Sequence, residues 1–169
     1  MIREIIKYGR PELVRPSEKV DEFDEDLRSL ASDMLETMYD AEGVGLAAPQ
    51  VAINKRLIVV DVTSGRQDGN QYVLVNPEIA DSEGSQVGEE GCLSIPGFTA
   101  NVERPLSVKI KAQSLEGEPI EIEADEFLAR ALCHEIDHLE GILYLDRISP
   151  LKRQVIKRKI RKLMKSGEW

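Results

Sequence analysis

Residues 125–139 read DEFLARALCHEIDHL, and this stretch predicts a helix that carries chemistry. Asp125 is a good N-cap residue, and Gly141 suits the left-handed position just beyond a helix C-terminus. His134 and His138 are four residues apart, so on a helix they project from one face with their Cβ atoms about 5–6 Å apart. Two imidazoles at this spacing can bind the same metal ion.

Glu135 directly follows the first of these histidines. In a His-Glu-x-x-His helix, this carboxylate is placed to take a proton from a water molecule at the metal. A chance match on a surface helix is the alternative, because short motifs carry a false-positive risk. The composition argues against chance, since the chain has only two histidines and both stand at the ligand positions.

A catalytic metal site usually has three protein ligands and one open position, so a third ligand has to be found. Cys92 is the best candidate. It lies in the segment EGCLS, residues 90–94, where Gly91 allows a close backbone approach and a metal would hold the sulfur as a thiolate. The residues alone leave a second interpretation open, because a buried core thiol is a common state of cysteine.

Residues 43–50 read GVGLAAPQ and form a third unusual segment, rich in small side chains. Small side chains let another part of the chain come close. The segment lacks the Gly-Lys-Ser/Thr ending of a phosphate-binding loop. Dense packing between a helix and a strand explains it equally well.

The rest of the chain predicts an α+β domain spanning residues 1–169. From Asp24 to Tyr39, apolar residues recur at helical spacing, which predicts an amphipathic helix packed on a core. A basic helix is expected from about residue 150 onward. The strands are expected in stretches rich in β-branched residues, the last two joined as a hairpin: Arg56–Val62, Gln71–Asn76, Leu106–Gln113 and Ile120–Glu123.

Composition bounds the function. At 41% hydrophobic and 31% charged residues, the chain has no apolar run near the ~20 residues of a membrane-spanning helix. No secretory signal is visible after Met1, and two cysteines are too few for a disulfide framework, so the cytoplasm is the expected location. A net charge of -9 disfavours DNA as a partner.

The three segments, in this order, resemble the signature motifs of the peptide deformylase family: Gly-φ-Gly-φ-Ala-Ala-x-Gln, Glu-Gly-Cys-φ-Ser and His-Glu-x-Asp-His. Here they stand at residues 43–50, 90–94 and 134–138. The resemblance implies antiparallel sheets packed around a central metal-binding helix. It also implies that Cys92, His134 and His138 are the metal ligands and that Glu135 is the general acid and base.

Further site residues follow from the same resemblance. It gives Gln50 and the backbone N–H of Leu93 the task of stabilising an oxyanion, and it places Val44, Gly45 and Glu90 at the substrate. The implied substrates are polypeptides that begin with formyl-methionine. The implied metal is Fe²⁺, which Ni²⁺, Co²⁺ or Zn²⁺ can replace.

Neighbours of the ligands are less well defined. Glu42 and Asp137 are candidates to accept the remaining N–H of a ligand histidine, and Arg104 could pair with Asp137 or steady the Cys92 thiolate. Many family members have Gln where this chain has Cys133, which we interpret as a small core thiol. Two rival functions are a zinc peptidase and a binding module whose structural metal is closed by a fourth protein ligand.

The charge is unevenly distributed. Residues 150–169 carry eight Lys and Arg against Glu168, a balance of +7, which leaves the first 149 residues at -16. A solvated helix face is one interpretation, and docking on the ribosome through RNA phosphates, as in bacterial members resembling this chain, is the other. Leu151, Val155, Ile160 and Leu163 are expected to hold the helix on the domain. A cut after about Arg153 should then spare the turnover of short formyl-peptides.

Overall fold

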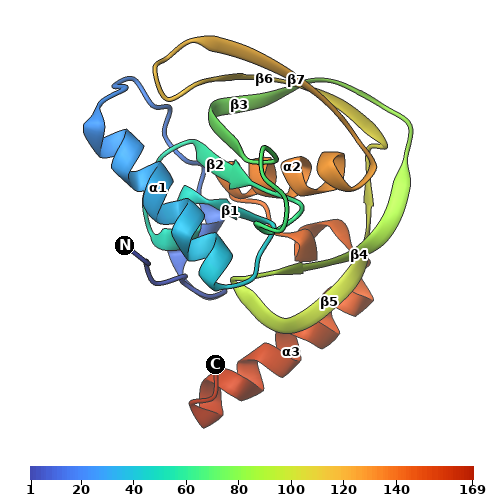
Figure 1. The fold of residues 1–169 in the computed structure, drawn as a ribbon. Helices are drawn as coiled ribbons and strands as arrows, with labels where there is room; N and C mark the ends of the chain where they lie inside the picture. Colours follow the sequence, from blue (N-terminus) through green and yellow to red (C-terminus); the bar gives the residue numbers. More distant parts are fainter.

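The helix expected at residues 125–139 is the centre of the fold (Figure 1). In the computed structural model, which describes residues 1–169, α2 (Glu126–Leu139) follows Asp125 and ends before Gly141, whose φ is +75°. Asp125 stands at the N-cap as predicted, but its carboxylate accepts a hydrogen bond from Ser107 Oγ at 2.7 Å and caps no backbone N–H. All residues of α2 from Ala129 to Leu139 are buried, so most of this helix lies inside the core.

Five antiparallel strands form the main sheet, in the order β1-β2-β3-β6-β7. The alternation of side chains along β2 explains why both faces of the sheet are covered. Ile58 and Val60 pack in the cluster that contains α2, whereas Leu57 and Val59 pack in the cluster that contains α1. The strands are β1 (Gly45–Ala47), β2 (Leu57–Val60), β3 (Tyr72–Glu83), β6 (Ser107–Gln113) and β7 (Pro119–Asp125).

The N-terminal amphipathic helix is confirmed as α1 (Glu25–Asp40). Asp24 is its N-cap, since its carboxylate accepts a hydrogen bond from the N–H of Leu27 at 3.0 Å. Leu27, Met34 and Met38 are fully buried against the sheet. The predicted hairpin is confirmed as well, because β6 and β7 pair over their whole length.

More than one antiparallel sheet was expected, and a second sheet is present, but its two strands were not among the predicted stretches. It consists of β4 (Gln86–Cys92) and β5 (Ile95–Arg104), and it lies on the other side of α2 from α1 (Figure 1). The short strand β1 and the extension of β3 to Glu83 were also missed. These stretches are rich in glycine, charged residues or exposed positions, which carry little β-propensity of their own.

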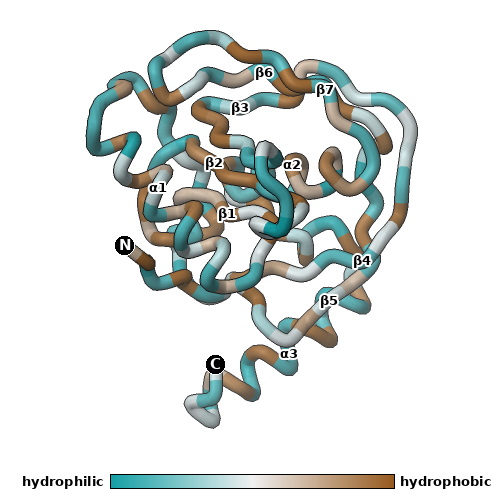
Figure 2. The backbone as a smooth tube through the Cα atoms, in the orientation of Figure 1, coloured by the Kyte–Doolittle hydropathy of each residue, from teal (hydrophilic) through white to brown (hydrophobic).

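The basic helix is α3 (Pro150–Ser166), which runs along the edge of the fold beside β5 (Figure 1). Figure 2 shows that polar and apolar residues alternate along it. The predicted packing face was partly wrong: Ile156 and Ile160 are buried, whereas Leu151 is 77% exposed and Val155 40% exposed. None of the helices combines the length and the apolar character needed to cross a membrane.

Candidate metal centre

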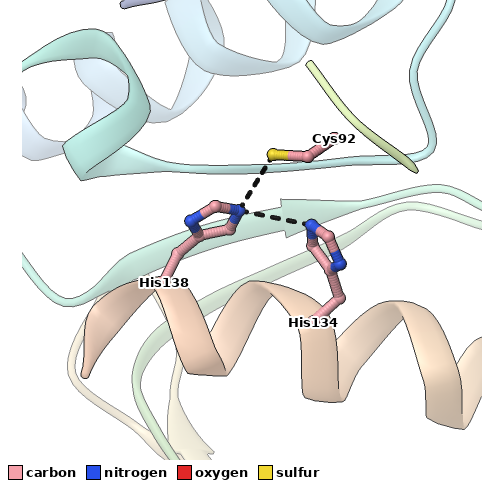
Figure 3. Close-up of side chains that lie close together, drawn as sticks. All are labelled: Cys92, His134 and His138. Atoms are coloured by element: carbon pink, nitrogen blue, oxygen red, sulfur yellow. Dashed lines mark hydrogen bonds between the residues drawn. The ribbon is translucent and has the colours of Figure 1, made fainter. Parts of the chain in front are cut away.

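Cys92, His134 and His138 converge on one point (Figure 3). Their ligand atoms all lie within 4.8 Å of one another. Cys92 Sγ is 3.4 Å from His138 Nε2, which is 3.2 Å from His134 Nε2. These three donors, one sulfur and two imidazole nitrogens, suit iron or zinc better than a hard cation such as Mg²⁺.

Two separate elements supply these ligands. Both histidines project from the same face of α2, as their spacing predicted, and Cys92 is the last residue of β4, just before the turn to β5. No further His, Cys, Asp or Glu joins the group. Three protein ligands leave a position open, as in catalytic rather than structural sites.

Glu90 orients the first histidine. Its Oε1 lies 2.9 Å from His134 Nδ1, so Nε2 is the nitrogen that faces the metal position. Arg104 and Arg130 both pair with the same carboxylate, at 2.7 Å and 2.6 Å. Burial acts to raise the pKa of Glu90, but the hydrogen bonds from Arg104 and His134 dominate and lower it to about 2. The carboxylate is therefore ionised and held on several sides.

The other expected neighbours of the histidines lie elsewhere. Glu42 lines the cleft but makes no hydrogen bond to either imidazole, and Nδ1 of His138 has no hydrogen-bond partner within the chain. Asp137 pairs with Arg104 at 2.6 Å and with Arg147 at 2.8 Å. Of the two roles expected for Arg104, the pairing with Asp137 is the one that forms.

Glu135 is buried at 4% exposure beside the ligands. Its Oε1 has no hydrogen-bond partner, and a Cβ on Gly45 would collide with its Oε2. Glycine at position 45 is therefore required for β1 to pass so close to this carboxylate. Burial raises the pKa of Glu135 to about 7, which suits a group that must both accept and release a proton.

Gln50 and Leu93 flank the same point. The side-chain amide of Gln50 is fixed at both ends: Oε1 accepts from the N–H of Ala47 at 3.0 Å, and Nε2 donates to Ser94 Oγ at 3.1 Å. Nε2 also lies 3.5 Å from Cys92 Sγ. The N–H of Leu93, in the turn between β4 and β5, donates no hydrogen bond within the chain and remains free for another acceptor.

A cleft of about 520 Å³ opens beside these groups. One wall is the segment before and within β1, which includes Val44 and Gly45, and β1 is the edge strand of its sheet. The carbonyl of Val44 accepts from Asp61 N–H, so by alternation the peptide groups of Gly45 point away from β2. Glu89 and Gly91 of β4 and Phe127 and Arg130 of α2 also line the cleft.

Sequence reasoning missed two residues of the site. Tyr144 stacks on His134 with ring centroids 6.3 Å apart, and Arg130 pairs with Glu90. Neither belongs to a motif, so only their place in the fold identifies them. Cys133 lies in the core cluster at 3% exposure, where burial raises the pKa of its thiol to about 11. It is a core thiol, as expected.

Known proteins resemble this chain over its whole length. The family model for polypeptide deformylase matches residues 2–154. A peptide deformylase of Acidobacterium capsulatum is 51% identical over 169 residues, 100% of this chain and 99% of that protein. One from Thermodesulfovibrio yellowstonii is 52% identical over 160 residues, 95% of this chain and 97% of that protein.

Solved structures resemble it equally well. A peptide deformylase from Legionella pneumophila superposes with a TM-score of 0.91 at 44% identity, covering 99% of this chain and 98% of that one. The enzyme from Thermus thermophilus gives a TM-score of 0.87 at 41% identity, covering 95% of this chain and 94% of that one. The mixed architecture of helices and antiparallel sheets is thus shared.

Proposed function

Because the chain belongs to the peptide deformylase family, we propose that Cys92, His134 and His138 hold its divalent metal ion and that Glu135 is its general acid and base. The protein removes the N-terminal formyl group from formyl-methionyl polypeptides and releases formate. The observation that carries the assignment is the convergence of the three ligand atoms beside the buried Glu135.

When bound, the ion supplies Lewis acidity, which lowers the pKa of a water molecule and polarises the formyl carbonyl. Fe²⁺ is our choice for the native metal, because a thiolate and two imidazoles form a donor set of intermediate softness. Ni²⁺, Co²⁺ and Zn²⁺ fit the same donors. Glu90 supports the set by fixing the ring of His134.

Glu135 moves the proton. Its carboxylate takes a proton from the attacking water, and it then gives that proton to the departing amine as the C–N bond breaks. Both steps need a group whose pKa is near neutrality, in keeping with the buried position of this side chain. Products are formate and a peptide with a free α-amine.

The oxygen of the formyl group gains negative charge during the attack. We assign its stabilisation to Gln50 Nε2, which lies 3.5 Å from Cys92 Sγ, and to the N–H of Leu93, the residue that follows Cys92. One such donor is worth about 3 kcal/mol of transition-state stabilisation. Ala47 and Ser94 hold the amide of Gln50 in place, so the N–H that lies toward Cys92 is the one assigned to the oxyanion.

The substrate backbone is proposed to pair with the outward peptide groups of Gly45, next to Val44, as an added strand on the free edge of β1. The methionine side chain would then enter the part of the cleft near the ligands. Glu90 lines this cleft, but its carboxylate oxygens already accept from Arg104, Arg130 and His134. We therefore assign Glu90 to positioning His134.

The rival functions fit less well. A fourth protein ligand, which a closed structural site needs, is absent from the group around Cys92. The third histidine or glutamate ligand usual in zinc peptidases is absent as well. Activity on formyl-Met-Ala-Ser, compared with cleavage of internal peptide bonds, distinguishes the deformylase from a peptidase.

Glu135→Gln tests the proposed roles. We expect this variant to bind metal as the wild type does but to lose at least about 10²- to 10⁴-fold in turnover of formyl-Met-Ala-Ser, because the proton carrier is gone and the ligands remain. Metal content by elemental analysis and kcat by formate release are the two measurements. Near-wild-type turnover would remove Glu135 from its role.

The choice of Fe²⁺ has its own test. Protein purified without oxygen is expected to contain about one iron per chain, and Cys92→Ser should lose iron or change metal preference, because an alcohol is a poor substitute for a thiolate. Stoichiometric zinc in the anaerobic preparation, with full activity, would overturn the choice of iron.

We also propose that α3 docks the protein on the ribosome in the cytoplasm, where nascent formyl-methionyl chains emerge. None of the eight Lys and Arg residues of α3 takes part in an ion pair, and six of them are exposed. They therefore form no direct ion pairs with the acidic body. Unpaired cations along one helix suit phosphate contacts on RNA.

Charge reversal tests the docking better than truncation, because a cut after Arg153 would also remove the buried Ile156 and Ile160. Reversing three exposed cations of α3 to Glu (Arg158, Lys162 and Lys165) should weaken cosedimentation with ribosomes in a salt-dependent way and leave turnover of formyl-Met-Ala-Ser unchanged. The matched control reverses three exposed cations outside α3: Lys19, Arg66 and Lys111. If the α3 variant and the control variant lose ribosome binding equally, α3 has no specific docking role and is only a solvated surface.

A further inference from the structure

Trp169, which lies beyond the end of α3, contacts a wall of the substrate cleft. Its ring packs on Phe98 of β5, with ring centroids 6.3 Å apart and an angle of 54° between the planes. Phe98 in turn is one of the residues that line the cleft. Trp169 is therefore separated from the cleft by the side chain of Phe98.

Two hydrogen bonds fix Trp169 in this place. Its indole N–H donates to the carbonyl of Tyr8 at 2.9 Å, and its main-chain oxygen accepts from Lys7 Nζ at 3.1 Å. The N–H of Tyr8 donates to the carbonyl of Ser94 at 2.8 Å. The segment that holds Trp169 is therefore joined directly to the turn that follows Cys92.

The part of the wall next to Phe98 is exposed to solvent. Pro96 and Gly97 are exposed, and Gly97 has a φ of +86° with no atom of the protein within 4 Å of where its Cβ would be. The two ends of this stretch pair with β4, and Phe98 between them is held by two further contacts. From inside the fold, Tyr144 donates a hydrogen bond to the Phe98 carbonyl at 3.1 Å. From outside, Trp169 packs on the ring.

We propose that Trp169 is a positioning residue: it holds Phe98 in the wall of the cleft and thereby sets the affinity for the formyl-peptide. The proposal rests on the proposed function, since it takes the cleft beside the ligands as the peptide site. It assigns to Trp169 no contact with the reacting atoms. Its effect is expected in KM and not in kcat.

Fluorescence provides a direct readout, because Trp169 is the only tryptophan of the chain. We expect titration of the metal-loaded enzyme with the product peptide Met-Ala-Ser to change the tryptophan emission, with the same half-saturation as its inhibition of turnover. Phe98→Ala should abolish the change, because it removes the side chain that joins the cleft to the indole. An unchanged emission spectrum at peptide concentrations that inhibit turnover would overturn the proposal.

Kinetics provide the second test. Trp169→Ala is expected to raise KM for formyl-Met-Ala-Ser about three- to tenfold at unchanged kcat, the scale of one aromatic contact. Trp169→Phe keeps an aromatic ring and should stay within about twofold of the wild type. Leu151→Ala is the control, since it also removes an apolar side chain from the α3 region but lies exposed.

A double-mutant cycle shows whether the effect passes through Phe98. If it does, Trp169→Ala adds nothing to KM in the Phe98→Ala background, because the contact is already lost. Additive effects of the two substitutions, or a Trp169→Ala variant with wild-type KM, would reject the positioning role. The wild-type protein in the same assay separates a failure of the positioning role from a failure of the proposed function. If the wild type does not turn over formyl-Met-Ala-Ser, the proposed function is rejected.

Discussion

At the scale of single residues, Glu90 shows what the sequence could and could not reveal. The motif EGCLS identified the segment, and the resemblance placed Glu90 at the substrate. Its observed partners come from β5 and from α2, 14 to 44 residues away in the chain. No local pattern predicts contacts between such distant positions, so the buried cluster of Glu90, Arg104, Arg130 and His134 emerges only from the fold.

Glu90→Gln should therefore be costly. It removes the charge that neutralises two arginines with nearly buried side chains, at 2% and 6% exposure, and breaking a buried pair in this way destabilises by about 3–5 kcal/mol. The ring of His134 also loses its acceptor, which should weaken metal affinity about 10- to 100-fold. Chemical denaturation and metal titration measure the two effects. Wild-type stability and affinity together would show that the cluster is dispensable.

The two cysteines are expected to differ in oxidation. Cys92 is partly exposed at the cleft, whereas Cys133 is 3% exposed in the core, so peroxide should reach Cys92 first and inactivate the enzyme. Loading with Ni²⁺ in place of Fe²⁺ should slow the loss. Peptide mass spectrometry after partial inactivation locates the oxygen, and a first modification at Cys133 would contradict this order.

At the scale of elements, helices were easier to predict than strands. The apolar residues of α1 and α2 recur at helical spacing within each segment, so the segment alone predicts the helix. By contrast, β4 reads QVGEEGC, with two glycines and two glutamates, and its local β-propensity is poor. It is a strand because it pairs with β5 along Gln86–Gly91, and this tertiary cause cannot be seen in the segment itself.

The corrected packing face of α3 leads to a matched pair of variants. Ile160→Ala should destabilise the protein by about 2–5 kcal/mol, because Ile160 is fully buried in the cluster with Ile95 and Tyr144. Leu151→Ala should change stability by less than about 0.5 kcal/mol, since Leu151 is 77% exposed. Urea unfolding of both variants provides the comparison. Equal effects would mean that α3 packs differently in solution.

At the scale of the whole molecule, the proposed metal position joins two parts of the fold that otherwise belong to different sheets. Cys92 comes with the two-stranded sheet, while the histidines belong to the helix that packs on the five-stranded sheet. An ion bound by all three therefore cross-links the fold. Anything that binds the native state and not the unfolded chain stabilises the native state by mass action.

Removal of the ion should lower the melting temperature. At an ion concentration of about 1,000 times Kd the stabilisation is about 4 kcal/mol, and for a chain of this size that corresponds to about 8–16 °C. Calorimetry before and after chelation measures the shift, and adding Ni²⁺ back should restore it. Cys92→Ser should show a smaller shift. No shift after verified metal loss would mean that the ligand positions are held by the protein alone.

The free edge of β1 is only three residues long, and its proposed role limits when a nascent chain can bind. A strand can be added there only if the incoming N-terminus is extended and has no partner of its own. Nascent chains emerge at about 5–20 residues per second, whereas a β-hairpin can form in about 1–10 μs. Folding of the substrate is thus a competitor of deformylation. Proteins whose first residues fold early should keep their formyl group longer than those whose first residues stay open.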